Sequence, residues 1–204
     1  MPVPAPSPDA RAVVTGASQN IGEALATELA ARGHHLIITA RRGDVLAEVA
    51  QRITDKYGVT VEVRACDLTD PADRDKLCAE LAERNISILC ANAGTATFGA
   101  VADLPAEGEK AQVQLNVQDV HDLVLAVLPG MIARKGGGIL ISGSAAGNSP
   151  IPNNATYAAT KAFVNTFSES LRGELGGTGV HVTLLAPGPV RTQTPSAEDA
   201  SIVD

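Results

Sequence analysis

The side chains best placed for chemistry in this sequence are a tyrosine and a lysine four residues apart. Tyr157 and Lys161 fall in a segment of helical period, so their side chains share one face of the helix. A phenol has a pKa of about 10, and a neighbouring ammonium stabilises the phenolate, so such a pair can act as an acid or a base near neutral pH. Alone, this spacing is usually an accidental surface pair, and the surrounding residues decide its meaning.

Two more polar residues can complete a site around this pair. Ser144 follows an apolar run that predicts a strand, and its hydroxyl can donate a hydrogen bond to a carbonyl oxygen on which negative charge develops. Asn116 lies in a long predicted helix and could hold a water molecule that returns the proton, although spacing alone does not establish this role. The four residues together form the candidate catalytic group.

A loop with two glycines connects the first predicted strand to the first predicted helix. Its sequence, over residues 15–22, is Thr-Gly-Ala-Ser-Gln-Asn-Ile-Gly. Gly16 permits a tight turn, Gly22 lets the helix approach the strand, and the exposed N–H groups at the helix start favour a pyrophosphate. Such a loop can also be an ordinary strand-to-helix turn. The prediction of dinucleotide binding therefore depends also on the residues that follow the second strand.

The residues that follow the second predicted strand are arginines, at the position where a fold selective for NAD has an acidic residue. Arg41 and Arg42 follow the second predicted strand, and guanidinium groups suit the 2′-phosphate of NADP(H). A solvated charge pair is the alternative. Asp67, after the third strand, can accept a hydrogen bond from the adenine amino group. The small Ala93 and Gly94 would let the backbone pass close to the adenosine ribose.

Short apolar runs alternate with longer segments of helical period along the chain. Most of these runs are apolar throughout, which is typical of strands buried on both faces of a parallel sheet. The pattern predicts an α/β protein with a Rossmann-like, doubly wound parallel sheet, in three α/β/α layers and one domain, with ligands bound beyond the carboxyl ends of the strands. The predicted strands are residues 12–15, 36–39, 59–65, 86–91, 139–142 and 180–185, and the predicted helices are residues 21–32, 44–57, 71–84, 107–131 and 155–175.

Composition excludes several classes of function. The 204 residues are enough for one buried core, and a formal net charge of -7 leaves no broad basic surface for nucleic acid. Cys66, Cys78 and Cys90 form no C-x-x-C pair, and the four histidines have no ligand-like neighbours, so neither a disulfide framework nor a metal site is predicted. No apolar run reaches a transmembrane length, and the proline-rich residues 1–10 predict a flexible tail rather than a signal peptide. A cytoplasmic protein is therefore expected.

From residue 11 to residue 194 the sequence resembles the short-chain dehydrogenase/reductase family. The resemblance rests on the motifs TGASQNIG, CDL, ANAG, ISGSAAG, YAATK and PGPVRT, which follow one another in the family's order. It implies a catalytic tetrad of Asn116, Ser144, Tyr157 and Lys161, in which Lys161 also holds the nicotinamide ribose. The NADP(H)-binding residues that it implies are Gly16, Ser18, Gln19, Asn20, Ile21, Gly22, Arg41, Arg42, Asp67, Leu68, Asn92, Ala93, Gly94, Tyr157, Lys161, Pro187, Gly188, Val190 and Thr192, with Val190 and Thr192 at the carboxamide.

Three positions depart from the family pattern. Asn20 replaces the second glycine of the loop, Gln19 stands where NADP-using members often carry a basic residue, and Ala91 replaces the first asparagine of Asn-Asn-Ala-Gly. Asparagine tolerates a left-handed backbone, so Asn20 need not disturb the turn. Without a basic residue at position 19, binding of the 2′-phosphate depends on Arg41 and Arg42.

More narrowly, the segments ASQNIGEALA, LCANAGTATFG and SAAGNSPIPNNATYAATKAF resemble the reductases of mycolic-acid-producing bacteria that reduce the 3-oxo group of a mycolate precursor. This implies a long, branched 3-oxoacyl lipid as the substrate and the 3-hydroxy form as the product. The alternatives are a general 3-oxoacyl or small-ketone reductase and a non-catalytic regulator that senses NADP. The family resemblance also implies a homodimer or homotetramer. Residues 195–204 are interpreted as the start of an incomplete substrate loop.

Overall fold

The computed structural model describes residues 3–190, which form a single sheet of six parallel strands between helices. The strand order is β3-β2-β1-β4-β5-β6. Strands β2 and β3 are thus added on one side of β1, and β4, β5 and β6 on the other side. This is the Rossmann-like, doubly wound arrangement that the sequence predicts. The strands are β1 (Arg11–Thr15), β2 (Leu36–Ala40), β3 (Val61–Ala65), β4 (Ile86–Ala91), β5 (Gly137–Ser142) and β6 (Val180–Leu185).

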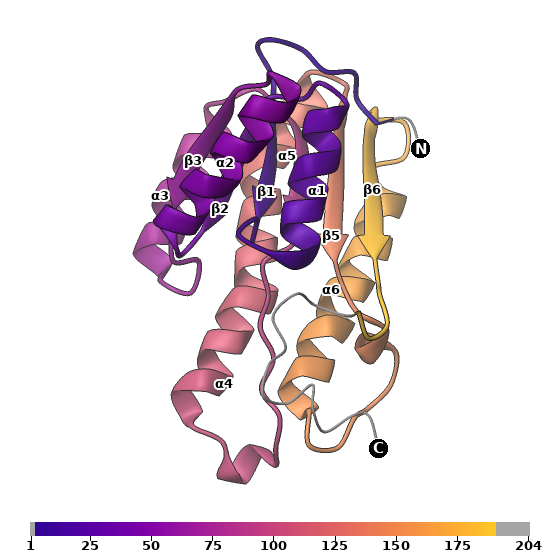
Figure 1. Cartoon of the computed structure of the whole chain (residues 1–204). Helices are drawn as coiled ribbons and strands as arrows, with labels where there is room; N and C mark the ends of the chain where they lie inside the picture. The colour runs from indigo at the N-terminus through magenta and orange to yellow at the C-terminus, as the bar shows by residue number, and fades with distance from the viewer. Residues whose placement is uncertain (1–2, 191–204) are drawn as a thin grey trace.

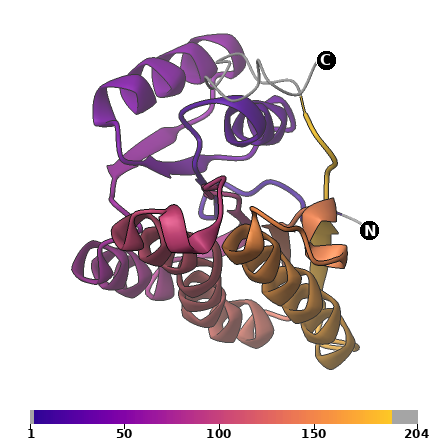
Figure 2. The same ribbon diagram turned by 90° about the horizontal axis from the view of Figure 1, so that it is seen from below.

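Helices cover both faces of the sheet and give the molecule its three layers (Figures 1 and 2). Two helices, α1 and α2, lie on one face, and α3, α5 and α6 lie on the other. The carboxyl ends of the strands point toward the bottom of Figure 1, where α4 projects beyond the sheet. The helices are α1 (Asn20–Ala31), α2 (Gly43–Tyr57), α3 (Pro71–Ala82), α4 (Ala106–Val113), α5 (Asp119–Ala133) and α6 (Ala155–Glu174), with short 3-10 turns at Val101–Asp103 and Ala145–Asn148.

Successive residues of the central strand β1 enter cores on opposite faces of the sheet. Val13 packs with residues of α3, α5 and α6, whereas Ala12 and Val14 pack with residues of α1 and α2. All three side chains are fully buried. Because side chains alternate along a strand, a strand covered on both faces must be apolar at every position. The continuous apolar runs therefore predicted the layered sheet correctly.

Three strands begin at other residues than the sequence predicts, and the first of them, β1, begins at Arg11 rather than at residue 12. β3 begins at residue 61 rather than 59, because Thr60 instead donates its backbone N–H to Nδ1 of His35 at 2.9 Å. β5 begins at Gly137 rather than at residue 139. A β-carbon at Gly137 would lie 2.5 Å from the sulfur of Met131, so only glycine lets this end of the strand pass under α5. A search for apolar runs overlooks such a glycine.

The single long helix predicted over residues 107–131 is interrupted. α4 ends at Val113, a π-helical turn (η2, Gln114–Gln118) follows, and α5 begins at Asp119. The turn carries Asn116, whose carboxamide bonds the backbone of Thr95 through Oδ1 at 2.9 Å and Nδ2 at 2.8 Å. A π turn takes up one extra residue, so a search at the α-helical period does not detect it.

The amino-terminal segment lies at the end of the sheet opposite to the strands' carboxyl ends (Figure 1). Pro6 lies beside Gly33 and Pro4 beside Gly138, where added β-carbons would be 3.6 Å and 3.4 Å from the proline rings. Ala10, at the end of the segment, is buried. Within the stretch predicted to be a flexible tail, Pro4 therefore lies beside β5 and Pro6 beside the turn that follows α1.

The three cysteines are free thiols, and burial raises the pKa of each. The pKa is about 11 at Cys66 and about 12 at Cys78 and Cys90, so the thiols stay protonated and poorly nucleophilic at neutral pH. Over residues 3–190, no helix is long and apolar enough to cross a membrane. In the same range, no three His, Cys, Asp or Glu side chains are grouped to hold a metal ion.

Candidate active site

A cleft of about 980 Å³ follows the carboxyl ends of the strands from β3 to β5 and ends at α6. It spans the point where the strand order reverses, which is where doubly wound sheets bind ligands. The structure thus brings together segments that are far apart in the sequence. The predicted site residues that line the cleft are Gly16, Ser18, Gln19, Asn20, Ile21, Gly22, Arg41, Arg42, Asp67, Leu68, Asn92, Ala93, Gly94, Tyr157, Lys161 and Pro187.

Other predicted residues lie outside this lining. Asn116 and Ser144 are buried beside it, at 1% and 9% exposure, while Gly188 and Val190 are exposed and do not line the cleft. Thr192 lies outside the described residues. The cleft is also lined by residues to which the sequence analysis assigned no binding or catalytic role, namely Ala40, Cys66, Thr69, Thr95, Ala96, Leu115, Ser142 and Gly143.

The loop between β1 and α1 depends on two glycines and an asparagine. Gly16 adopts a left-handed backbone, with φ of 65°, at the turn. A β-carbon at Gly22 would lie 2.1 Å from the carbonyl oxygen of Gly16, so the first turn of α1 can rest on the loop only without a side chain there. Asn20 is also left-handed, with φ of 53°, which is the conformation that asparagine tolerates. Asn20, Ile21 and Gly22 line the cleft, so the start of α1 borders it.

Asn92 ties three strand ends together under the cleft. Its backbone N–H and that of Ala93 donate to Oγ1 of Thr15 at 3.0 and 2.9 Å, and its Nδ2 donates to the carbonyl of Thr15 at 3.1 Å. The hydroxyl of Ser142 donates to Oδ1 of Asn92 at 3.0 Å. Sequence reasoning missed Thr15 and Ser142. Both could have been proposed from the sequence, since each is a hydroxyl residue at the end of an apolar strand.

The end of the cleft near β2 is open and charged. Arg41 and Arg42 are exposed, and Nη2 of Arg42 donates to Oε1 of Gln19 at 2.9 Å across the loop. Asp67 accepts hydrogen bonds from the hydroxyl and the N–H of Thr69, and chiefly the hydroxyl bond lowers the pKa of this carboxyl, with Arg41 adding to the effect. This end therefore offers guanidinium groups beside an ionised carboxylate.

The opposite end of the cleft holds the tyrosine and the lysine. Nζ of Lys161 lies 5.7 Å from the centre of the Tyr157 ring and donates to the carbonyl of Ser142 at 2.8 Å. The lysine is only 6% exposed, and burial lowers its pKa to about 8. It still carries a proton at neutral pH, so a positive charge stands beside the phenol. Such a buried cation in a cleft is typical of functional sites.

A buried network connects Asn116 to the helix that carries this pair. Besides its bonds to Thr95, Nδ2 of Asn116 donates to Oγ1 of Thr160 at 3.1 Å, and that hydroxyl donates to the carbonyl of Tyr157 at 2.8 Å. A β-carbon at Gly94 would lie 3.2 Å from Oδ1 of Asn116 and 3.6 Å from Nζ of Lys161. The π turn, the loop after β4 and α6 therefore meet at one point beside the cleft.

Ser144 begins the short turn that leads from β5 toward α6. Its Oγ accepts a hydrogen bond from the N–H of Ala146 at 3.1 Å. The backbone of Ser144 is bonded to the side chain of Asn165, which sequence reasoning did not consider. The spacing of Asn165 from Lys161, one helical turn, places it on the same face of α6 and could have pointed to it.

A family profile described as short chain dehydrogenase matches residues 10–201. The chain belongs to this family. Among the curated relatives of this short-chain dehydrogenase, a bovine protein named very-long-chain 3-oxoacyl-CoA reductase is 38% identical over 187 residues, which are 89% of the chain and 60% of the bovine protein. The chain therefore spans less than two thirds of that relative's length.

Solved structures agree with the family assignment. A short-chain dehydrogenase from Sphingobium yanoikuyae in complex with NADPH superposes with a TM-score of 0.87 at 38% identity, covering 90% of this chain and 72% of that one. The bulky-bulky ketone specific alcohol dehydrogenase from Comamonas testosteroni superposes with a TM-score of 0.86 at 35% identity, covering 91% and 75% of the two chains. The predicted family and fold are thus confirmed.

Proposed function

We propose that this short-chain dehydrogenase reduces a ketone with NADPH and that Tyr157 supplies the proton. One observation carries the proposal, namely a single cleft that joins a glycine loop and two guanidinium groups at one end to the pair of Tyr157 and Lys161 at the other. The first end suits a dinucleotide and the second suits acid–base chemistry. A carbonyl reductase needs both within one cavity.

The residues of the cleft fit NADP(H). Gly22 lets the start of α1 approach the loop at Gly16, and the first turn of a helix in this position suits a pyrophosphate. Arg41 and Arg42 are exposed and suit a 2′-phosphate, and Asp67 suits the adenine amino group. The bound NADPH of the relative from Sphingobium yanoikuyae supports this choice. When bound, the nicotinamide supplies a hydride to the carbonyl carbon.

The chain's own residues supply the proton and hold the carbonyl group. The hydroxyl of Tyr157 donates its proton to the carbonyl oxygen, and the ammonium of Lys161 beside the ring stabilises the phenolate that remains. The hydroxyl of Ser144 donates a hydrogen bond to the same oxygen as negative charge develops on it. Asn116 is bonded to α6 through the hydroxyl of Thr160. In this position it would hold a water molecule that returns the proton to Tyr157.

For the substrate we propose a 3-oxoacyl group on a long, mycolate-precursor-like lipid. Two lines support it, the resemblance in sequence described above and the bovine relative's name, which concerns very long 3-oxoacyl chains. A general 3-oxoacyl or small-ketone reductase is the second candidate. The similarity to a dehydrogenase for bulky ketones favours this wider range.

The test is NADPH oxidation, followed by the loss of nicotinamide absorbance, with three probes. The probes are a long-chain 3-oxoacyl-CoA, acetoacetyl-CoA and cyclohexanone. A kcat/KM at least about tenfold higher for the long chain, or about 1.4 kcal/mol in transition-state binding, supports the lipid substrate. Equal values would favour the general reductase. Tight binding of NADPH without oxidation by any probe would instead support the non-catalytic sensor.

An oligomer is part of the same proposal. Leu125 and Ile132 on α5 and Phe163 on α6 are large apolar side chains that are 55%, 40% and 42% exposed. Large apolar side chains that are exposed on the outer helices favour association between copies. Light scattering on a size-exclusion column distinguishes a dimer or tetramer from a monomer.

A further inference from the structure

The turn that carries Ser144 is fastened to α6 by the side chain of Asn165. Nδ2 of Asn165 donates to the carbonyl of Ser144 at 2.9 Å, and Oδ1 accepts from the N–H of Ser144 at 3.4 Å. The same Nδ2 also lies 3.3 Å from Oδ1 of Asn148, at the end of the turn. Asn165 is 8% exposed, so water competes little for these bonds.

Two glycines make room for this contact. A β-carbon at Gly143 would lie 2.1 Å from Oδ1 of Asn165, and one at Gly147 would lie 2.6 Å from Nδ2. At Gly147 the added carbon would also meet the backbone of Lys161 at 2.5 Å. The turn therefore rests directly on α6, with a glycine on each side of the asparagine carboxamide.

We propose that Asn165 is a positioning residue that holds the hydroxyl of Ser144 in register with Tyr157 and Lys161. The inference rests on the proposed reduction of a ketone, in which Ser144 binds the carbonyl oxygen. The carboxamide of Asn165 offers both a donor and an acceptor to the backbone of Ser144. A carboxylate lacks the donor, and the similarly shaped leucine lacks both.

The fastened turn orients the serine hydroxyl. Oγ of Ser144 already accepts the N–H of Ala146 at 3.1 Å, which leaves the hydroxyl proton to be donated elsewhere. Lys161 adds a second bond from α6, to the carbonyl of Ser142 two residues earlier. Thus the proton donor, the cation and the oxygen-binding hydroxyl belong to one rigid unit. A misplacement of about 1 Å in such a unit can reduce turnover about 100-fold.

The first test replaces Asn165 by leucine, which keeps the shape but not the hydrogen bonds. With acetoacetyl-CoA as the probe, we expect kcat to fall about 10- to 100-fold while the Kd for NADPH changes less than about twofold, since the cofactor loop is not touched. Ser168→Ala is the matched control. Ser168 is fully buried on the same helix and bonds the carbonyl of Val164, so its loss costs stability without moving the turn. An equal fall in kcat in both variants overturns the proposal.

A double-mutant cycle separates positioning from a general structural role. In the Ser144→Ala background, Asn165→Leu should lower kcat by less than about twofold, because a residue that acts through Ser144 has nothing left to position. If the two effects multiply instead, Asn165 does not act through the serine. Should the leucine variant fail to fold, Asn165→Asp, which keeps the acceptor and loses the donor, takes its place in the cycle.

Hydrogen exchange provides a readout that needs no turnover. Asn165→Leu should speed exchange of the backbone N–H groups of residues 144–147 at least about tenfold relative to the unmutated protein and Ser168→Ala. Unchanged protection of these residues overturns the proposal. If the unmutated protein reduced no ketone, the proposed function would fail, and the exchange comparison alone would then decide whether Asn165 holds the turn.

Discussion

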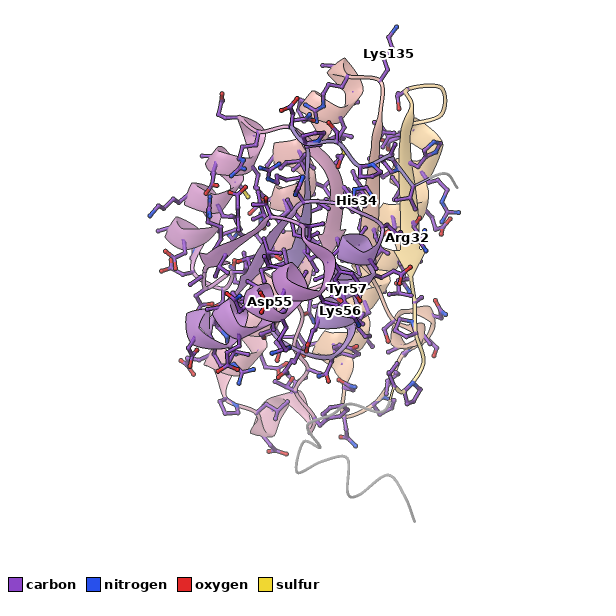
Figure 3. All side chains as sticks on the ribbon, turned by 45° about the horizontal axis from the view of Figure 1, so that its top comes forward. Arg32, His34, Asp55, Lys56, Tyr57 and Lys135 are labelled. Atoms are coloured by element: carbon purple, nitrogen blue, oxygen red, sulfur yellow. The ribbon has the colours of Figure 1, made fainter. Side chains whose placement is uncertain are left out.

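The described residues contain two contacts between a lysine ammonium and a tyrosine ring, and the contacts differ in burial. At the end of α2, Nζ of Lys56 lies 5.1 Å from the centre of the Tyr57 ring, on the surface of the molecule (Figure 3). On α6, Nζ of Lys161 lies 5.7 Å from the Tyr157 ring. The first lysine is exposed, whereas the second is 6% exposed, bonds the carbonyl of Ser142 and lines the cleft.

The difference shows that contact alone does not make a reactive pair. An exposed cation over an aromatic ring contributes about 0.5 to 1 kcal/mol and no chemistry. Burial lowers the pKa of Lys161 to about 8, so the ammonium still predominates at neutral pH, beside the phenol in the lining of the cleft. Helix α6 places the pair at the carboxyl ends of the strands, whereas Tyr57 lies outside the lining of the cleft. Location and burial therefore separate the two pairs.

The largest effect is expected from removing the hydroxyl of Tyr157, with removal of the Tyr57 hydroxyl as the comparison. Tyr157→Phe should lower kcat about 10²- to 10⁴-fold, because it removes the proposed general acid, and it should leave NADPH binding nearly unchanged. Tyr57→Phe should leave both unchanged. Steady-state kinetics and NADPH titration of the two variants make the comparison. Substantial turnover by Tyr157→Phe would assign the proton to another group.

The next effect lies at the far end of the cleft and separates binding from chemistry. Arg41→Asp should weaken NADPH by about 1.5 to 3 kcal/mol, while NADH, which has no 2′-phosphate, binds as before. At saturating cofactor, kcat should stay the same, since Tyr157 and Lys161 are untouched. Titration with both cofactors measures the change. Equal affinity of the unmutated protein for NADPH and NADH would contradict this reading of Arg41.

A smaller effect is expected in the pH dependence of stability. The pKa of Lys161 is lowered to about 8 in the fold, so between that value and the ordinary lysine range the unfolded chain binds more protons. Stability contributed by this group therefore rises with pH over that window. Lys161→Met should remove the rise and stabilise the protein by about 1 to 2 kcal/mol near pH 7, once the lost bond to Ser142 is counted. Denaturant unfolding from about pH 7 to 10 measures it.

The control for this prediction comes from the exposed pair. Lys56→Met should leave the slope of stability against pH between about 8 and 10 unchanged, because water already solvates that ammonium. If Lys161→Met and Lys56→Met behaved alike, the burial of Lys161 would have no energetic consequence in solution. The contrast between the two pairs would then be lost.

The smallest effect concerns the exposed bond between Arg42 and Gln19. Gln19→Ala removes a partner that lies at 2.9 Å, but both side chains are exposed. We expect a change below about 0.5 kcal/mol in the free energy of unfolding and less than about twofold in the Kd for NADPH. Chemical denaturation and cofactor titration check these limits. A larger loss of affinity would show that Gln19, which lines the cleft, contributes more to cofactor binding than its exposed contact with Arg42 indicates.

Much of the fold could be predicted because burial on both faces leaves a direct mark on the sequence. Val13 and its neighbours are apolar for the reason that two helical layers cover them. The π turn around Asn116 left no such mark, since one extra residue changes neither composition nor hydropathy. The start of β5 at Gly137 was not predicted for a related reason. Gly137 matters because it has no side chain where Met131 packs, and this space is seen only in the folded chain.

The candidate site likewise contains residues that the sequence could predict and residues that it could not. Tyr157 and Lys161 could be found because four residues of separation on a helix define a distance. The same spacing places Asn165 on the face of Lys161, but the contacts of Thr160 and Asn165 could not be predicted. Each bonds a segment that only the folded chain brings near, the π turn in one case and the Ser144 turn in the other. The roles of Gly188 and Val190 stay predictions, since neither lines the cleft.

The π turn between α4 and α5 also limits how the length of this region can change. Each residue advances an α-helix by about 100°, so the extra residue in the turn sets the phase of α5 against that of α4. Asn116 meets the loop after β4 while Leu123 and Val127 meet the sheet, and both alignments hold only with that offset. A single-codon deletion here would rotate one helical face away from its partner. Insertions and deletions are therefore expected to be tolerated far less within residues 114–118 than in the exposed turn at 101–103.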